Sequence, residues 1–273
     1  AGRSPLGLTL CALLLVLVSA SRRGAGARGE HDSRGGTLAT HSFVRSLAFK
    51  QRLRICNAYP YASPLDVFIG QARLTTEPLP YKVCGEFLPE LRVDDKIDFK
   101  VDGTSAGTFT ISELPNNDAV LLMVIYRHST GSTAVAFESH VFAGLNSPQI
   151  AVLDTYKGEA KAELRIQDKT QSQINLRSEV LRFDNVVAVD PGVYEVLLLN
   201  ETSNSTKAKA ELVAVPHEAY VVIRCGVEAQ LGQRYPEELM VYPMSDRRNL
   251  GGSAGMRISG LTFLAMLLGL LVQ

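Results

Sequence analysis

Alternating apolar and polar positions in the middle of the chain predict β-strands. In the segment Asp98-Phe99-Lys100-Val101, apolar side chains recur at every second position, which is the period of a half-buried strand. The segment Ala119–Tyr126 is almost continuously apolar, as expected for a strand in the centre of a sandwich. Short strands separated by turns, without a long 3.6-residue period, predict an all-β fold. The six strands predicted in the first half are Arg52–Asn57, Leu65–Gly70, Lys96–Asp102, Thr108–Glu113, Ala119–Tyr126 and Ala134–Phe142.

The same pattern returns about 97 residues later. At this offset Cys56 lies over Leu153, and Phe99 lies over Val196. Further matches at offset 97 are Arg54–Tyr59 with Ala151–Tyr156 and Asp66–Ile69 with Glu163–Ile166; Ala119–Val124 matches Ala219–Ile223 at offsets of 100–101. One loop insertion would explain the drift. We therefore expect two tandem immunoglobulin-like β-sandwich modules, over residues 52–146 and 147–245.

Apolar segments near both ends predict a route through the secretory pathway. Leu6–Val18 follows Arg3 and precedes the small residues around Ala20, which predicts a signal peptide over residues 1–20; an N-terminal membrane anchor is the alternative. Residues 21–50 are rich in Arg, Gly and Ser and predict a flexible lead-in.

A second apolar segment, Leu261–Val272, nearly ends the chain and follows a cluster of small residues. This order predicts a GPI-attachment signal over residues 246–273, with Gly251, Gly252 and Ser253 as candidate attachment sites. The alternative is a tail helix that stays in the membrane. Both interpretations predict helical terminal segments and place the body of the protein at the cell surface or outside the cell.

Charge excludes some classes of partner. The chain has 28 basic and 28 acidic residues. Removing residues 1–20 and 253–273 takes away Arg3 and Arg257, which leaves 26 basic and 28 acidic residues and a net charge of −2. A weakly acidic body without a basic patch argues against nucleic acid as a partner and against strong attraction to anionic lipid.

Cysteines and glycosylation sequons agree with secretion. Cys56 and Cys84 fall in one predicted module and are the expected disulfide pair, whereas Cys225 lies in an apolar strand and is expected to be a buried thiol. The sequons at Asn200 and Asn204 lie between two strand-like segments and predict a glycosylated hairpin loop, equivalent to Gly103–Gly107 in the first module.

Residues able to perform catalysis are sparse. The histidines His128, His140 and His217 accompany no G-x-S-x-G elbow, and Glu138 beside His140 lacks a third ligand for a metal. We therefore predict no catalytic residue, metal site or cofactor.

The turn Tyr59-Pro60-Tyr61 is a candidate binding loop, because Tyr can stack on a sugar or on a partner protein. The alternative is that Tyr59 belongs to the core, since Tyr156 takes its place in the repeat.

Three short motifs carry a resemblance to a known family. They are Arg54-Ile55-Cys56-Asn57-Ala58, Leu65-Asp66-Val67-Phe68-Ile69-Gly70 and Pro191-Gly192-Val193-Tyr194. With their order and spacing, the chain from Arg52 to Pro243 resembles the tandem modules of the AlgF family of alginate O-acetylation adaptors. The resemblance implies a non-catalytic role beside exopolysaccharide enzymes. The first module departs from the pattern with Val93-Asp94-Asp95-Lys96, and a GPI-like tail is not expected of a periplasmic adaptor.

Taken together, these features predict a secreted, membrane-anchored, non-enzymatic protein that binds or scaffolds in the extracellular matrix or wall. A polysaccharide or a surface protein would be its partner. The alternatives are an AlgF-like accessory adaptor for polysaccharide O-acetylation and an unrecognised hydrolase. An aromatic surface patch would favour a binding protein or an adaptor, whereas a polar cluster in a cleft would favour a hydrolase.

Overall fold

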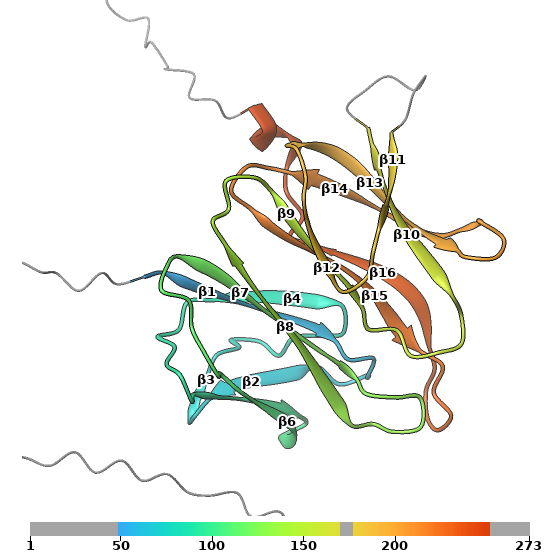
Figure 1. Ribbon diagram of the computed structural model, residues 1–273. Helices are drawn as coiled ribbons and strands as arrows, with labels where there is room; N and C mark the ends of the chain where they lie inside the picture. The colour runs from blue at the N-terminus through green and yellow to red at the C-terminus, as the bar shows by residue number, and fades with distance from the viewer. Residues whose placement is uncertain (1–48, 170–176, 252–273) are drawn as a thin grey trace, which may run out of the picture. The chain divides into compact units, whose positions relative to one another are not determined.

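The computed structural model describes residues 49–169 and 177–251, so the predicted signal peptide, nearly all of the lead-in and most of the predicted tail lie outside the described residues. The described part contains sixteen strands and one short 3-10 helix, η1 (Arg247–Gly251) (Figure 1). The first eight strands are β1 (Gln51–Ala58), β2 (Leu65–Ile69), β3 (Ala72–Arg73), β4 (Val83–Phe87), β5 (Lys96–Val101), β6 (Thr104–Thr110), β7 (Ala119–Arg127) and β8 (Val135–Ala143). The second eight are β9 (Gln149–Asp154), β10 (Ala162–Asp168), β11 (Ser178–Leu181), β12 (Asn185–Ala188), β13 (Gly192–Asn200), β14 (Thr206–Ala214), β15 (Ala219–Val227) and β16 (Tyr235–Tyr242).

The two sets of eight strands have the same topology. The first set forms sheets of order β4-β1-β7-β8 and β3-β2-β5-β6, and the second set forms β12-β9-β15-β16 and β11-β10-β13-β14. Each strand of the first set therefore has a counterpart eight strands later. In both sets one central pair is parallel, β1 with β7 and β9 with β15. The prediction of an all-β chain with two tandem sandwich modules is confirmed.

Three apolar cores hold the four sheets together. One core fills each sandwich, around Phe99 in the first module and around Leu198 in the second. The third core lies between the modules and joins side chains of β1 and β7, including Val124, to side chains of β9 and β15, including Val221. The sheets that contain β1 and β9 are thus buried on both faces, as the nearly continuous apolar strand Ala119–Tyr126 predicted.

Strand registers correct part of the predicted repeat. The offset of 97 holds for β1 and β9, because Asn57 and Asp154 each accept a hydrogen bond from the backbone N–H two residues on, at 3.0 and 3.1 Å. In the next hairpin the register shifts directly after Phe99 in the first module and directly after Leu198 in the second, and these two residues pair with Val67 and Leu164, which are also 97 residues apart. Phe99 therefore corresponds to Leu198 and not to Val196.

The offset is 101 for β14, since Phe99 pairs with Gly107 and Leu198 pairs with Ala208, and it returns to 99 at β15. Cys56 pairs with Val124, and its counterpart Leu153 pairs with Ile223, so the offset between β7 and β15 is 99 and not 100–101. The second module thus gains two residues between β10 and β13, gains two more in the hairpin between β13 and β14, and loses two before β15. An offset of 100 would have turned each side chain to the opposite face of its sheet.

The fourth predicted strand begins earlier than expected. Its prediction was Thr108–Glu113, whereas β6 starts at Thr104. Asp102 and Gly103 both have positive φ, 49° and 78°, which is the conformation of a two-residue hairpin turn that matches strand twist. The chain therefore reverses at once, and Thr104–Gly107 is strand instead of loop.

A buried arginine connects the two modules. The Arg54 side chain has no exposed surface, and its guanidinium donates hydrogen bonds to Glu86 of its own module and to the Ala219 carbonyl of the other. It also lies 3.0 Å from a Glu218 carboxylate oxygen and 5.1 Å from the centre of the Tyr242 ring. One fully desolvated cation is thereby satisfied by groups from both modules, so it fixes their contact.

Replacing Arg54 by alanine should lower the free energy of unfolding by about 3 kcal/mol, because two partly buried carboxylates lose their shared cation. Denaturant unfolding of the purified protein measures this change. Arg52→Ala is the matched control, since Arg52 approaches the same two carboxylates but is 34% exposed, and should cost less than about 1 kcal/mol. Equal losses in the two variants would contradict a special role for the buried cation.

Candidate functional site

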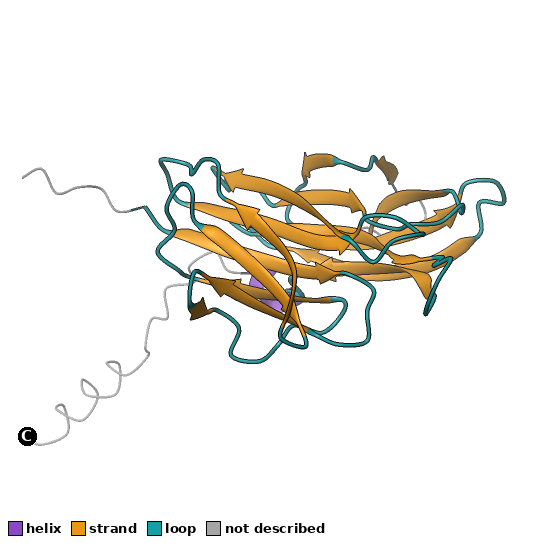
Figure 2. Ribbon diagram, turned by 90° about the horizontal axis from the view of Figure 1, so that it is seen from below, coloured by secondary structure: helices purple, strands orange, loops and turns teal. Residues whose placement is uncertain are grey.

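The strands lie side by side, and the loops gather at their two ends (Figure 2). Both ends of the described chain lie at the end where β1 and β15 start, since the Lys50 backbone bonds to Asp118 and Tyr242 pairs with Val221 near the start of β15. The opposite end carries the loops after β1 and β15. The candidate surfaces divide between these two ends.

A group of tyrosines lies at the far end, where the modules meet. We call it the tyrosine seam and define it as Tyr61, Tyr81 and Tyr235 with Lys82 and Glu238. The rings of Tyr81 and Tyr235 come from different modules and meet edge to face, with centroids 5.3 Å apart. Lys82 and Glu238 form an ion pair across the same junction.

Tyr61 completes this seam. Burial raises the pKa of Tyr235, and the Tyr61 phenol raises it further by electrostatic repulsion. The Tyr235 hydroxyl donates to the Gln233 side-chain oxygen at 3.3 Å. Ring faces and hydrogen-bonding groups of two modules therefore share one surface.

The two predicted binding-loop tyrosines have different environments. Tyr59 is only 6% exposed, and its hydroxyl donates to the Thr133 carbonyl at 2.7 Å, so it packs in the first sandwich. Tyr61 is 42% exposed, with its ring centroid 5.8 Å from that of Tyr59. Of the pair, only Tyr61 presents a ring to a partner. Its electrostatic effect on Tyr235 was not predicted, because the two residues lie far apart in the sequence.

A disulfide joins Cys56 and Cys84, as predicted, and these residues lie directly opposite each other on β1 and β4. Cys225 is free and buried in the core between the modules. Burial raises the pKa of the Cys225 thiol to about 11, despite an opposing contact with the Tyr81 hydroxyl. A thiol in this environment is protonated at neutral pH and is a poor nucleophile.

The two sequons lie where the strand pattern placed them, at a hairpin tip. Asn200 ends β13 and accepts a hydrogen bond from the Thr202 N–H at 2.9 Å through its side-chain oxygen, and Asn204 is exposed in the turn that follows. The equivalent turn of the first module is Asp102–Gly103, shorter than the predicted Gly103–Gly107. Glycosylation of Asn200 and Asn204 stays a prediction.

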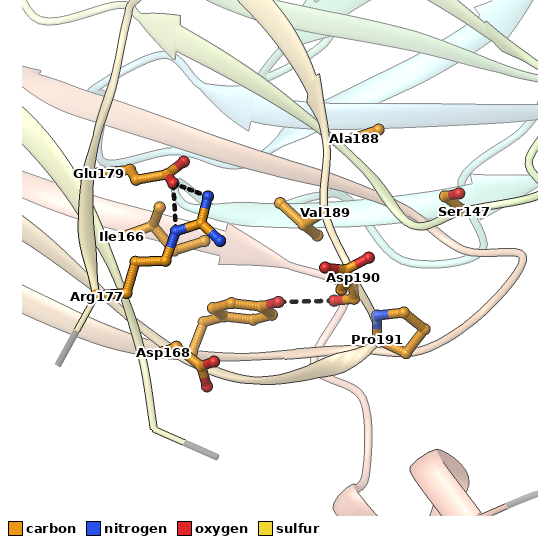
Figure 3. A pocket seen from close by; sticks show the side chains of 10 residues that line it. Ser147, Ile166, Asp168, Arg177, Glu179, Ala188, Val189, Asp190 and Pro191 are labelled. Carbon is orange, nitrogen blue, oxygen red and sulfur yellow. Dashed lines mark hydrogen bonds and ion pairs between the residues drawn. The ribbon is translucent and has the colours of Figure 1, made fainter. Parts of the chain in front are cut away.

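A pocket of about 480 Å³ opens in the second module, near the end where β13 starts (Figure 3). Its polar walls come from the ends of β10 and β11 and from the turn between β12 and β13. Arg177 and Glu179 form an ion pair on one wall, with Nε and Oε1 2.7 Å apart, and the Tyr194 hydroxyl donates to the Asp190 carbonyl at 2.8 Å. The lining residues are Ser147, Ile166, Asp168, Arg177, Glu179, Ala188, Val189, Asp190, Pro191 and Tyr194.

The histidines considered for catalysis lie apart from this pocket. His217 approaches the Leu145 carbonyl through Nδ1 at 2.8 Å, and His140 packs on the Phe142 ring, where burial lowers its pKa. Among residues 49–169 and 177–251, no three His, Cys, Asp or Glu side chains are grouped to hold a metal ion.

The predicted attachment sites begin at the edge of the described chain. Gly251 is the last residue of η1, and Gly252 and Ser253 lie outside the described residues. Arg247 in η1 forms an ion pair with Glu211 of β14, which holds this helix against the second module. No helix in the described part of the chain has the length and apolar character needed to span a membrane.

No known family model matches the chain, and no curated protein is significantly similar to it. Among solved structures, the chain is similar to CBMbc, a family CBM26 module from Eubacterium rectale Amy13K in complex with maltoheptaose. The two share 7% sequence identity with a TM-score of 0.24, over 71% of this chain and 98% of that chain.

Cys225 should not react with Ellman's reagent at pH 8 in the folded protein, because the thiol is buried and protonated. Unfolding without a reductant should expose one thiol per mature chain, since Cys56 and Cys84 remain bridged. Absorbance at the end of the reaction gives the count. Rapid labelling of the folded protein, or a disulfide-linked peptide that contains Cys225, would contradict the assignment.

Proposed function

We propose that this protein is a secreted, membrane-anchored, non-enzymatic protein that binds polysaccharide at the cell surface through the tyrosine seam. The supporting observation is that Tyr81 and Tyr235, from different modules, meet edge to face at the junction that the Lys82–Glu238 ion pair crosses, with the exposed Tyr61 ring on the neighbouring loop. The AlgF-like adaptor role is the related alternative and is supported only by the sequence motifs.

The composition of the seam suits a sugar. A tyrosine offers a flat apolar face for the C–H groups of a sugar ring and a hydroxyl for hydrogen bonding, at a low cost in side-chain entropy. Gln233, Lys82 and Glu238 add donors and acceptors for sugar hydroxyls beside these rings. Because a shared apolar core holds the two modules together, the rings keep their spacing before a ligand arrives.

The position of the seam supports an outward-facing role. Lys82 bonds to the Asn57 carbonyl near the end of β1, whereas η1 and the first residues of β1 lie toward the opposite end of the strands. A glycolipid attached at Gly251, Gly252 or Ser253 would hold the protein by that end. The tyrosine seam and the sequon hairpin would then point away from the membrane.

Polysaccharide binding should depend on Tyr61 and Tyr235. A glycan array probed with the full chain, expressed through a secretory pathway, identifies the bound sugar. Tyr61→Ala and Tyr235→Ala should each weaken its binding about fivefold or more, because each removes one stacking face worth about 1 kcal/mol. Phe49→Ala is the control, since Phe49 is 43% exposed but lies near the start of β1. Binding that survives both tyrosine substitutions would overturn the role of the seam.

Anchoring predicts release by phospholipase. Treatment of intact cells with a phosphatidylinositol-specific phospholipase should free the protein, because the apolar tail would have been exchanged for a glycolipid. Western blotting of the supernatant measures this release. Recovery of a peptide spanning Leu261–Val272 from protein that stays on the membrane would instead establish a tail helix.

A further inference from the structure

The pocket of the second module lies away from the tyrosine seam and is not used by the proposed function. We propose that it is a second binding site, which takes the positively charged amino group of an amino sugar. The inference rests on the volume of the pocket, its balance of charge and its aromatic wall.

The charged groups of the pocket favour a cation. Three carboxylates line it, those of Asp168, Glu179 and Asp190, against one guanidinium, that of Arg177. With three carboxylates against one guanidinium, the lining carries a net formal charge of −2, and Arg177 forms an ion pair with Glu179. An anionic ligand would be repelled by this field, whereas an ammonium group would be attracted.

Tyr194 responds to the same field. Burial is the main cause that raises the pKa of its phenol, and the negative charges of Asp168 and Asp190 raise it further, while Arg177 acts in the opposite direction. The carboxylates therefore outnumber the cation at the position of the ring. The direction of this pKa shift agrees with the excess of carboxylates in the pocket wall.

The Tyr194 ring also gives the pocket a shape that suits a sugar. Its hydroxyl is tied to the Asp190 carbonyl at 2.8 Å, so the ring is held in place as one wall. An aromatic face attracts a cation and also stacks on the C–H face of a sugar ring. A volume of about 480 Å³ falls in the usual range for small-ligand sites and exceeds the needs of a bare ion.

The repeat supplies an internal comparison. At the offset of 99 that strand pairing establishes for β5 and β13, Tyr194 corresponds to Asp95 in the first module. Asp95 accepts a hydrogen bond from the Arg92 N–H at 2.8 Å and closes a local turn in which Asp94 has positive φ. The aromatic wall is therefore a property of the second module and not a requirement of the fold.

Titration calorimetry of the full mature protein with glucosamine, N-acetylglucosamine and glucose tests the charge requirement. Glucosamine should bind at least about tenfold more tightly than the two neutral sugars, and its binding should weaken as the salt concentration rises. Equal affinity for glucosamine and N-acetylglucosamine, or no binding of glucosamine, would overturn the proposal. If Nα-acetyl-lysine amide bound as tightly as glucosamine, an ammonium group alone would be sufficient, and the pocket would not be specific for an amino sugar.

Variants locate the binding. Asp190→Asn removes one carboxylate but keeps the backbone carbonyl that accepts the Tyr194 hydrogen bond, and should weaken glucosamine binding about fivefold or more. Tyr194→Ala should weaken it further. Glu90→Gln, which removes an exposed carboxylate of the first module, is the matched control and should leave the affinity unchanged. If the Glu90 variant lost as much affinity for glucosamine, the net charge of the protein would explain the effect, and the proposed site would be wrong.

Circular dichroism spectra and melting curves of each variant separate loss of binding from loss of fold. Tyr61→Ala should not change glucosamine affinity, whereas it should reduce binding of a polysaccharide at the tyrosine seam. The two proposals can therefore fail independently.

Discussion

The packing of one sheet of each module against the other determines the rest of this structure. All nine residues of β15 are buried, and β7 is buried at all but one position, because each central sheet is covered on both faces. Separating the modules would expose the core around Val124 and Val221 and would leave Arg54 without the Ala219 carbonyl. Apolar burial supplies the attraction, and the buried guanidinium restricts how the two sheets meet. The two repeats therefore share one core in addition to the core that each has of its own.

The sequence predicted the parts of the fold that depend on local pattern. Apolar continuity identified Ala119–Tyr126 as a central strand, and the recurrence of Tyr59 as Tyr156 revealed the repeat. The short strands β3 and β4 were missed, because they have little alternation of their own. The start of β6 was predicted too late in the chain, although the sequence Asp102-Gly103 is typical of a two-residue hairpin turn.

The candidate sites were harder to predict because they depend on long-range contacts. From its charge, Arg54 would be expected at the surface, and it is buried only because the second module packs over it. Tyr61 was singled out from its loop, but Tyr235 of the same seam comes from the other repeat. Tyr194 belongs to the Pro191-Gly192-Val193-Tyr194 motif that carried the family resemblance, yet its place in a pocket required the positions of Arg177 and Asp190.

The repeats differ at several positions, some of which lie in the apolar cores. The second module has Leu153 and Asp184 where the first has the Cys56–Cys84 disulfide, and strand pairing makes Arg224 the counterpart of Ile125. Arg224 is nearly buried and bonds to Asp154 and Glu237, so the second module uses ion pairs where the first uses apolar packing and a covalent bridge. Each module has thus kept its strand order while its polar contacts changed. The shared strand order tolerates such changes, and the replacement of Asp95 by Tyr194 is one that forms a wall of the pocket in the second module.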